Sequence, residues 1–458
     1  MDSSFSRLLE EIRSSMPICD SSSPAVWMDD SPYGLPSVFD VTEFACATMG
    51  AALGELAALS GSTSDLKLDR VLASRWFAWT IKPEGWDLPP TWDPIAGDYK
   101  ALDRWIRLHT NAPHHRDAAL RVLQCEADRE AVAEAVQQWN AIELESAVVA
   151  EGGCAAAMLS QDEWRSNLNG SKVSEDPLIA WSAASEDAAA SGRKLDDIDP
   201  DYPLKGLKVL DCTRVLAGPV CTRLLAGYGA EVLRIDPPEW DEGVVVPEVT
   251  LGKRLATLNL RDEAQRKHFA TLIEEADIFV HGYRPGALEG LGFGDDERRK
   301  LNPNLIDVSL CAYGLSGPWC DRRGFDSLVQ MSSGIAHAGM TVTGAEKPTP
   351  LPVQALDHGT GYLMAASVVR ALRLMREFGT AYRARLSLAR TAALLTSTGP
   401  HPVTVSMPDE KPDDWNTATE QTSWGPAHRM RFPMLSGLAQ PHWTLPARRY
   451  HSDPPAFS

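Results

Sequence analysis

Leu204-Lys-Gly-Leu-Lys-Val-Leu-Asp-Cys-Thr-Arg-Val-Leu-Ala-Gly-Pro219 opens the part of the chain that decides the fold, which continues to residue 377. In this part, short apolar segments typical of strands alternate with longer segments of helical spacing. Such alternation predicts a parallel β-sheet with helices on both faces, and therefore an α/β fold. The expected strands are residues 208–211, 231–236, 277–280 and 305–310, and the expected helices are residues 221–228, 262–276, 295–301 and 360–377.

The first strand–helix–strand unit has the outline of a dinucleotide-binding unit but lacks its glycines. A G-x-G-x-x-G turn directly after the first strand would let the backbone approach a pyrophosphate. Here the turn runs from Thr213 to Pro219, and Gly227 and Gly229 lie at the end of the following helix, where glycine commonly forms a cap. The sequence therefore argues against a nicotinamide site.

The composition limits the size of the protein and its partners. A chain of 458 residues, 44% of them hydrophobic, predicts two domains with sizeable cores. The net charge of -18 argues against nucleic acid or an anionic membrane as a partner, although a local basic pocket could still bind an anionic small molecule. No apolar run is long enough to span a bilayer, and residues 1–12 are too acidic for a signal peptide, so we expect a soluble, cytoplasmic protein.

Neither the cysteines nor the histidines form a recognised metal or disulfide pattern. Eight cysteines without a C-x-x-C pair are, in a chain of this size, typical of reduced thiols. His109, His114 and His115 form H-x-x-x-x-H-H, but nothing near them completes a metal-ligand spacing. We therefore predict no metal site.

Three short loops in the α/β half place arginine or lysine beside glycine. They are Leu251-Gly-Lys-Arg254, Tyr283-Arg-Pro-Gly286 and Arg322-Arg-Gly-Phe-Asp326. Open α/β sheets bind ligands at strand ends, and arginine and lysine suit phosphate oxygens. A single loop of this kind is more often a solvated turn, but three together favour a phosphate-bearing ligand.

Asp357 precedes the long expected helix and allows two interpretations. Aspartate is a common N-cap residue, and from its position alone we favour that structural role. The same position suits catalysis, because a helix N-terminus favours an ionised carboxylate and such a carboxylate can attack an activated acyl carbon.

Taken together, these segments resemble the family III (CaiB/BaiF-type) CoA-transferases, which include formyl-CoA transferases, carnitine CoA-transferase-like proteins and α-methylacyl-CoA racemases. The motifs follow the order of the family. They are Val209-Leu-Asp-Cys-Thr213, Leu216-Ala-Gly-Pro219, Tyr228-Gly-Ala-Glu-Val-Leu-Arg-Ile-Asp-Pro-Pro238, Gly252-Lys-Arg254, Tyr283-Arg-Pro-Gly286, Asn302-Pro-Asn-Leu-Ile306, Tyr313-Gly314, Gly324-Phe-Asp326 with Gln330, and Asp357-His-Gly-Thr-Gly361.

The resemblance implies a fold, a nucleophile and a substrate. The fold would be a Rossmann-like large domain with a parallel sheet, plus a smaller α+β domain, in an interlocked homodimer. Asp357 would be the nucleophile, coenzyme A or acyl-CoA the substrate rather than a permanently bound cofactor, and a carboxylic acid the acceptor. The implied CoA-binding residues are Leu216, Ala217, Leu251, Gly252, Lys253, Arg254, Gly282, Tyr283, Arg284, Arg323, Gly324, Phe325 and Asp326.

The first half of the chain resembles the small domain of the family, although that domain normally follows the Asp-bearing helix. Asp103-Arg-Trp-Ile-Arg-Leu108 and Gly152-Gly-Cys-Ala-Ala-Ala157 carry this weaker match. The chain thus resembles a rearranged member, or a fused pair with a degenerate first copy. We expect a peripheral segment (1–40), a small-domain-like half (41–190), a polar linker within 183–203, a Rossmann-like CoA-transferase domain (203–398) and a Pro- and Trp-rich tail (399–458).

Three departures from the family patterns narrow the expected reaction. Racemases of the family carry histidine where Phe325 stands, which disfavours racemisation here. Formyl-CoA transferases carry glutamine where Leu216 stands, which disfavours a formyl or oxalyl substrate. Gly282 replaces the usual asparagine, which weakens the expected contact at that position.

The sequence therefore predicts an acyl-CoA:carboxylate CoA-transferase that works through an aspartyl mixed anhydride and an aspartyl-CoA thioester. Two alternatives remain open at this point. One is an acyl-CoA isomerase or racemase in which His358, beside Asp357, acts as a base. The other is a non-catalytic protein that binds CoA esters or a partner protein, which the rearranged first half would suit.

Overall fold

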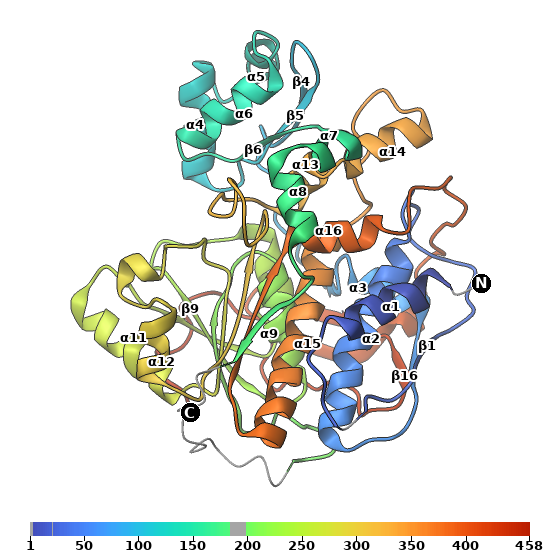
Figure 1. The fold of residues 1–458 in the computed structure, drawn as a ribbon, viewed down its shortest axis with the longest axis vertical. Coiled ribbons are helices and arrows are strands. Elements are labelled where there is room, and N and C mark those ends of the chain that lie inside the picture. The colour runs from blue at the N-terminus through green and yellow to red at the C-terminus, as the bar shows by residue number, and fades with distance from the viewer. Residues whose placement is uncertain (1–2, 21, 184–197) are drawn as a thin grey trace.

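The structure is a computed structural model that describes residues 3–20, 22–183 and 198–458. Figure 1 presents its ribbon. Most of the linker expected within 183–203, and the boundary expected at residue 190, lie outside the described residues.

A seven-stranded sheet forms the centre of the described structure, in the order β10-β9-β8-β11-β12-β13-β7. The strands from β10 to β13 are parallel and the edge strand β7 is antiparallel. Numbered from β8 along the chain, the parallel strands run 3-2-1-4-5-6, the order of dinucleotide-binding folds, which confirms the expected α/β, Rossmann-like sheet. The strands are β7 (Ala180–Ala183), β8 (Lys208–Cys212), β9 (Glu231–Asp236), β10 (Lys253–Thr257), β11 (Ile278–His281), β12 (Ile306–Cys311) and β13 (Tyr382–Ser387).

Successive side chains of the strands face different helix layers, as the two-residue period of a strand requires. Val209 and Val232 join the core that contains α9 and α15, whereas Leu210 and Leu233 pack with Phe269 of α11. Figure 1 shows α11 and α12 on one side of the sheet, α9 and α15 on the other, and α2 beside α15. These helices are α2 (Val41–Ser60), α9 (Ala217–Gly227), α11 (Glu263–Glu275), α12 (Asp295–Leu301) and α15 (Ala355–Phe378).

The first half contributes a smaller α+β unit, at the top of Figure 1. Its antiparallel sheet β4-β5-β6 packs on three helices around a separate core that includes Ile106, Val132 and Leu144. Residues 113–136 form two helices rather than one continuous helix. The elements are β4 (Gly97–Lys100), β5 (Trp105–Leu108), β6 (Ala155–Ala157), α4 (Pro113–Leu123), α5 (Arg129–Val136) and α6 (Ala141–Ala150).

Both ends of the described chain pack against the main body. Phe5, Leu8, Leu9 and Ile12 of α1 are buried against α2. They lie at i, i+3, i+4 and i+7, an amphipathic pattern hidden by the polar composition around it. Strands near the C-terminus pair with strands near the N-terminus. β16 pairs with β2, which also pairs with β1, and β15 pairs with β3 and with β14. The bounds are α1 (Ser4–Ser14), β1 (Val26–Met28), β2 (Leu66–Leu68), β3 (Ile81–Pro83), β14 (Trp415–Thr422), β15 (Gly425–Met430) and β16 (Met434–Ser436).

The remaining helices connect the small unit to the main body or cap the sheet. Among the helices of the described ranges, none has the length and apolar character that a membrane crossing needs. The connecting helices are α3 (Arg70–Trp76), α7 (Gln161–Ser166), α8 (Leu168–Glu175), α10 (Val246–Val249), α13 (Asp326–Ser332), α14 (Ile335–Thr343) and α16 (Leu388–Thr396), with short 3-10 turns at Gly243–Val245, Glu289–Leu291 and Pro412–Asp414.

Candidate active site

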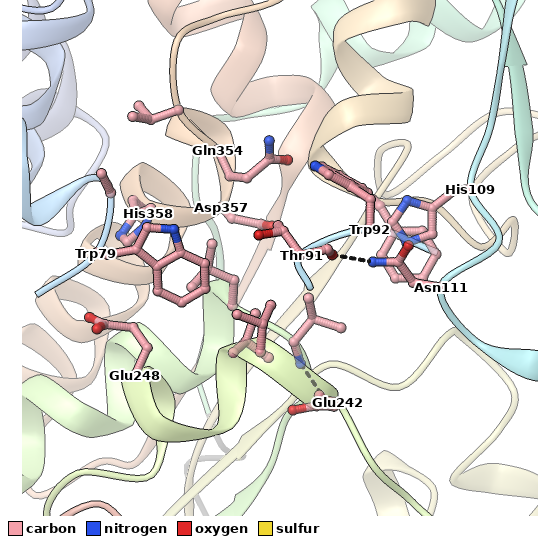
Figure 2. A pocket seen from close by; sticks show the side chains of 18 of the residues that line it. Trp79, Thr91, Trp92, His109, Asn111, Glu242, Glu248, Gln354, Asp357 and His358 are labelled. Carbon is pink, nitrogen blue, oxygen red and sulfur yellow. Dashed lines mark hydrogen bonds between the residues drawn. The ribbon is translucent and has the colours of Figure 1, made fainter. Parts of the chain in front are cut away.

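A cavity of 560 Å³ lies where the loops after β8 and β9 meet the start of α15. Ligands of open α/β sheets bind at the carboxyl ends of the strands, which is where these loops begin. The first half supplies the opposite wall, through residues 77–79, 90–93 and 109–112. Figure 2 shows Asp357 in the middle, with Trp79 and His358 on one side and Trp92 and His109 on the other. Segments far apart in the sequence thus enclose one site.

The long helix α15 begins at Ala355, five residues earlier than the sequence predicts, and this places Asp357 inside its first turn. The residue at the N-cap is Gln354, whose side chain makes no capping hydrogen bond. Gly359 and Gly361 lower the local helix propensity, but they are required here because neighbouring atoms leave no room for a Cβ. A Cβ on Gly359 would lie 2.2 Å from the Phe44 ring of α2, and one on Gly361 would lie 2.4 Å from the carbonyl oxygen of Ala217 in α9.

Asp357 is not the plain N-cap that its position in the sequence favours. Its side chain is 9% exposed and lines the cavity. No donor among the described residues forms a hydrogen bond with its carboxylate, whereas capping would require such a bond to a backbone N–H. The carboxylate is therefore held at the cavity without a structural partner.

The other three carboxylates that line the cavity are all bound from behind the wall. Glu248 is held by Arg223, Arg429 and Thr80, Glu242 by Arg234 and Tyr450, and Asp93 by Arg116 and Thr110. Because buried charges are normally paired, these three have ordinary structural roles. Asp357 differs from them in having no such partner among the described residues.

Asp326 fixes the start of α15 from below. Its carboxylate accepts hydrogen bonds from the backbone N–H of Asp357, at 2.9 Å, and from the side chain of Gln330. Gln330 in turn accepts a hydrogen bond from the N–H of Leu351, at 2.7 Å. The Gly324-Phe-Asp326 motif with Gln330 therefore positions Asp357, and the fully buried Asp326 lies beneath the site rather than on its surface.

Burial raises the pKa of both carboxyl groups, and for Asp357 the like charge of Asp326 adds to it. Burial raises the pKa of Asp326 to about 6, although its hydrogen bonds act in the opposite direction. Burial and the neighbouring Asp326 raise the pKa of Asp357 well above its usual range. Asp326 occupies the N–H donors at the start of α15, so the helix N-terminus does little to favour an ionised Asp357.

Two histidines in the cavity wall are neutral. Burial lowers the pKa of both His109 and His358 to about 3. His109 stacks on Phe325 with ring centroids 3.8 Å apart, and His358 stacks on Phe77 at 5.1 Å. A neutral imidazole with so low a pKa is a weak base.

Val215 has an unusual backbone conformation at the cavity wall. Its φ of 60° lies in the left-handed region, which a β-branched residue rarely adopts. The backbone N–H of Val215 donates to Glu242 at 2.7 Å, which holds this conformation and orients the neighbouring Leu216 into the wall. Strained backbone of this kind concentrates at functional sites.

The loop Leu251-Gly-Lys-Arg254, expected to contact CoA, lies largely beneath the surface. Lys253 is fully buried, with its ammonium 3.1 Å from both the Asp211 carboxylate and the Pro219 carbonyl oxygen. Burial lowers the pKa of Lys253 to about 8. Gly252 lies under the Trp443 ring, and Arg254 pairs with Glu231 at 3.3 Å and donates to Ser458. These side chains hold the sheet edge and the C-terminal segment together.

The other predicted CoA residues fall into three groups. Leu216 and Phe325 line the cavity with Asp357, and Ala217 begins α9 beside it. Away from the cavity, Gly282 and Arg284 are exposed after β11, while Tyr283 accepts a hydrogen bond from Arg214 at 2.7 Å. The third group of contacts lies at the small unit: Arg323 donates to the Gly152 carbonyl at 3.2 Å, and Gly324 packs tightly on Ala312 and Tyr313.

Sequence reasoning missed the aromatic wall contributed by the first half. Trp79 and Trp92 both line the cavity, as does Trp240 from the loop after β9. A cluster of tryptophans among prolines before residue 93 was the available signal, since aromatic side chains on loops commonly line ligand pockets. Their distance in sequence from Asp357 concealed the link.

Similar proteins are CoA-transferases. Residues 204–425 match the model of CoA-transferase family III. An acyl-CoA transferase of Fusarium pseudograminearum is 35% identical over 222 residues, which are 43% of this chain and 47% of the relative. The human succinyl-CoA:glutarate CoA-transferase is 32% identical over 197 residues, or 40% of this chain and 44% of the relative.

A probable fatty acyl-CoA transferase of Mycobacterium tuberculosis is 34% identical over 188 residues, or 38% of this chain and 47% of the relative. Its crystal structure covers 43% of this chain and 58% of that chain at 32% identity, with a TM-score of 0.38. The chain spans about half the length of these curated relatives. The family match covers the stretch of this chain that builds the parallel sheet and carries Asp357, so residues 204–425 are similar to CoA-transferase family III.

Proposed function

We propose that this protein is an acyl-CoA:carboxylate CoA-transferase in which Asp357 is the covalent nucleophile. One observation carries the proposal: Asp357 is the lining carboxylate that no described residue pairs, and it lies against a cavity at the sheet's ligand-binding edge. A group with that exposure, geometry and raised pKa is typical of a reacting residue.

The exchange would proceed through covalent steps at one carboxylate. An Asp357 oxygen attacks the thioester carbonyl, the C–S bond breaks, and CoA leaves as a thiolate from an aspartyl mixed anhydride. The thiolate attacks the aspartyl carbonyl, which releases the first acid and leaves an aspartyl-CoA thioester. The acceptor carboxylate then attacks this thioester, and the returning thiolate attacks the new acyl group, which frees Asp357. Covalent catalysis divides a hard exchange into easier steps.

The oxyanion of each step needs donors other than the start of α15, whose N–H groups are engaged by Asp326. The N-terminus of α9 supplies a suitable alternative. Its first N–H groups, at Ala217 and Gly218, have no acceptor among the described residues, and Leu216 just before them lines the cavity. Backbone donors at a helix N-terminus stabilise developing negative charge. The predicted positions Leu216 and Ala217 would then serve catalysis, because they lie at the helix N-terminus that stabilises the oxyanion.

The nucleotide end of CoA would lie along the exposed loops outside the cavity. Arg284 is exposed, and its guanidinium has no hydrogen-bond or ion-pair partner in the described part of the chain, which suits a phosphate. Arg323 is also exposed. We propose that Lys253 and Arg254 support this surface from the sheet edge, with Leu251, Gly252, Gly282 and Tyr283 shaping it.

The acyl-CoA isomerase alternative has little support at this site. It requires a base that removes a proton from the α-carbon, and His358 is the basic side chain beside Asp357. Because burial lowers the pKa of His358 to about 3, the imidazole is a poor proton acceptor. Deuterium exchange at the α-carbon of the acyl group would favour the isomerase alternative.

Two further features of the proposal follow from the resemblance and the relatives. The family resemblance implies an interlocked homodimer, which light scattering on the purified protein would test. The relatives do not identify one acyl donor or acceptor acid for this protein, because one relative is named for succinyl-CoA and glutarate and another for fatty acyl-CoA.

Trapping the covalent intermediate tests the proposed function. The protein is incubated with a panel of acyl-CoAs, quenched with hydroxylamine or borohydride, and digested for mass spectrometry. A modification on the Asp357 peptide, absent from the Asp357→Ala protein, is the expected result. Full transfer activity in Asp357→Ala would refute the nucleophile.

A further inference from the structure

The wall of the Asp357 cavity carries no positive charge. Among the described residues that line it there is no lysine or arginine. Its histidines, His109 and His358, have a pKa lowered by burial to about 3 and are neutral near pH 7. Its remaining ionisable groups are carboxylates: Asp93, Glu242, Glu248 and Asp357.

The nearest cations are held on the outer side of the wall by acidic partners. Arg223 and Arg429 bind Glu248, and Arg116 lies 3.3 Å from Asp93. Arg107 covers the Trp92 ring at 5.0 Å, but its guanidinium pairs with Asp98 at 2.7 Å. Arg214 covers the Trp240 ring at 4.4 Å, and its guanidinium pairs with Asp236 at 3.4 Å. Glu248 is 1% exposed, so turning Arg223 or Arg429 away from it and into the cavity is strongly unfavourable.

The rest of the wall is apolar. Trp79, Trp92, Val215, Leu216 and Phe325 present aromatic or aliphatic surface to the cavity, and Figure 2 shows the two indole rings on opposite sides of Asp357. Hydrocarbon gains free energy by leaving water for such a surface, whereas an additional carboxylate would lose its hydration and meet only neutral or negative groups.

We infer that the cavity accepts acyl groups with an uncharged, apolar chain, and rejects those that carry a second carboxylate. The inference rests on the proposed function, because donor and acceptor acids would occupy this one cavity in turn while bonded to Asp357. It therefore applies to both, and makes the protein a transferase of apolar monocarboxylic acids.

Binding of two matched CoA esters tests this without any turnover. Hexanoyl-CoA and adipoyl-CoA have acyl chains of equal length and differ in the terminal carboxylate. Calorimetry with the Asp357→Asn protein should give a dissociation constant about a hundredfold lower for hexanoyl-CoA, because the second carboxylate would be buried without a partner. Equal or tighter binding of adipoyl-CoA, or no binding of either ester, would overturn the inference.

A cation placed on the wall should weaken the preference for hexanoyl-CoA. Trp79→Arg brings a guanidinium to the cavity, and Trp79→Leu is the matched control that removes the same indole without adding charge. The ratio of hexanoyl-CoA to adipoyl-CoA affinity should fall at least about tenfold in Trp79→Arg relative to Trp79→Leu. An identical ratio in the two variants would count against the inference. The proposed function fails separately, through absence of transfer in the wild-type protein despite ester binding.

Discussion

Glu248 ties together the parts of the chain that enclose the cavity, and its removal should weaken the whole assembly. Its carboxylate accepts hydrogen bonds from the backbone N–H of Thr80 in the first half, at 3.0 Å, and from the Thr80 hydroxyl, at 2.6 Å. It also binds Arg223 of α9 and, at 3.3 Å, Arg429 of β15. The side chain is 1% exposed, so Glu248→Gln leaves the buried guanidinium of Arg223 without a counter-charge, whereas Arg429 keeps its ion pair with Glu420.

The expected loss follows from the burial of these charges. Breaking a buried ion pair by removing one partner costs ~3–5 kcal/mol, and since the amide keeps one acceptor oxygen we expect ~3 kcal/mol. An unfolding entropy of ~2.1 cal/mol/K per residue gives about 1 kcal/mol/K for this chain. Dividing the lost free energy by this entropy, we expect the midpoint of thermal unfolding to fall by about 3 °C. Differential scanning calorimetry of the two proteins at pH 7 measures the shift.

The control and the pH dependence make this prediction specific. Glu263→Gln removes an exposed carboxylate from an i,i+4 pair with Lys267 and should change the midpoint far less. Burial acts to raise the pKa of Glu248, but Arg223 and Arg429 outweigh it and hold the pKa below its usual value. Stability from a lowered carboxyl pKa is present above the unfolded value of about 4.3 and is lost on acidification, so wild type and Glu248→Gln should converge below about pH 4. Equal midpoints at pH 7 would refute the reasoning.

Three more outcomes are expected. Burial and Asp326 raise the pKa of Asp357, so the acid limb of the pH profile of kcat/KM should lie at a higher pH than the pKa of a free carboxylic acid. Asp326→Asn should move this limb to lower pH, and an unmoved limb would argue against the coupling of the two carboxyl groups. Gly359→Ala should cost ~1–3 kcal/mol in thermal unfolding, because its Cβ would strike Phe44, while Gly290→Ala, with nothing within 4 Å, should be nearly silent; similar losses in both would be inconsistent with the packing. Arg284→Ala should raise KM for acyl-CoA several-fold with little change in kcat, and the exposed Arg165→Ala should not; an unchanged KM in Arg284→Ala would remove that residue from the CoA site.

The sheet could be predicted because its signal is local. Lys208–Cys212 and Glu231–Asp236 each contain a continuous apolar core bounded by turns, and such segments specify strands wherever they occur. The start of α15 could not be predicted, because Gly359 and Gly361 lower local helix propensity while serving contacts with Phe44 and Ala217 that only the folded chain reveals.

The candidate site was predictable only on the side that carries the family motifs. Asp357, Leu216 and Phe325 lie in those motifs and do meet in the cavity. Lys253 follows the same motif pattern, yet its charge is buried against Asp211, and a sequence shows charge without showing burial. Trp79 and His109 reach the cavity through contacts distant in sequence, which no local pattern encodes.

Following one oxygen atom tests the central claim most directly. In the proposed mechanism the acceptor carboxylate leaves one of its oxygens on the nucleophile when the new acyl-CoA forms. After a single turnover with an acceptor acid labelled with 18O, the Asp357 peptide should carry one heavy oxygen. After a further round with unlabelled acceptor, that oxygen should appear in part of the released acid, because either oxygen of the Asp357 carboxylate can attack the thioester. Efficient transfer with an unlabelled Asp357 peptide would contradict the covalent role of Asp357.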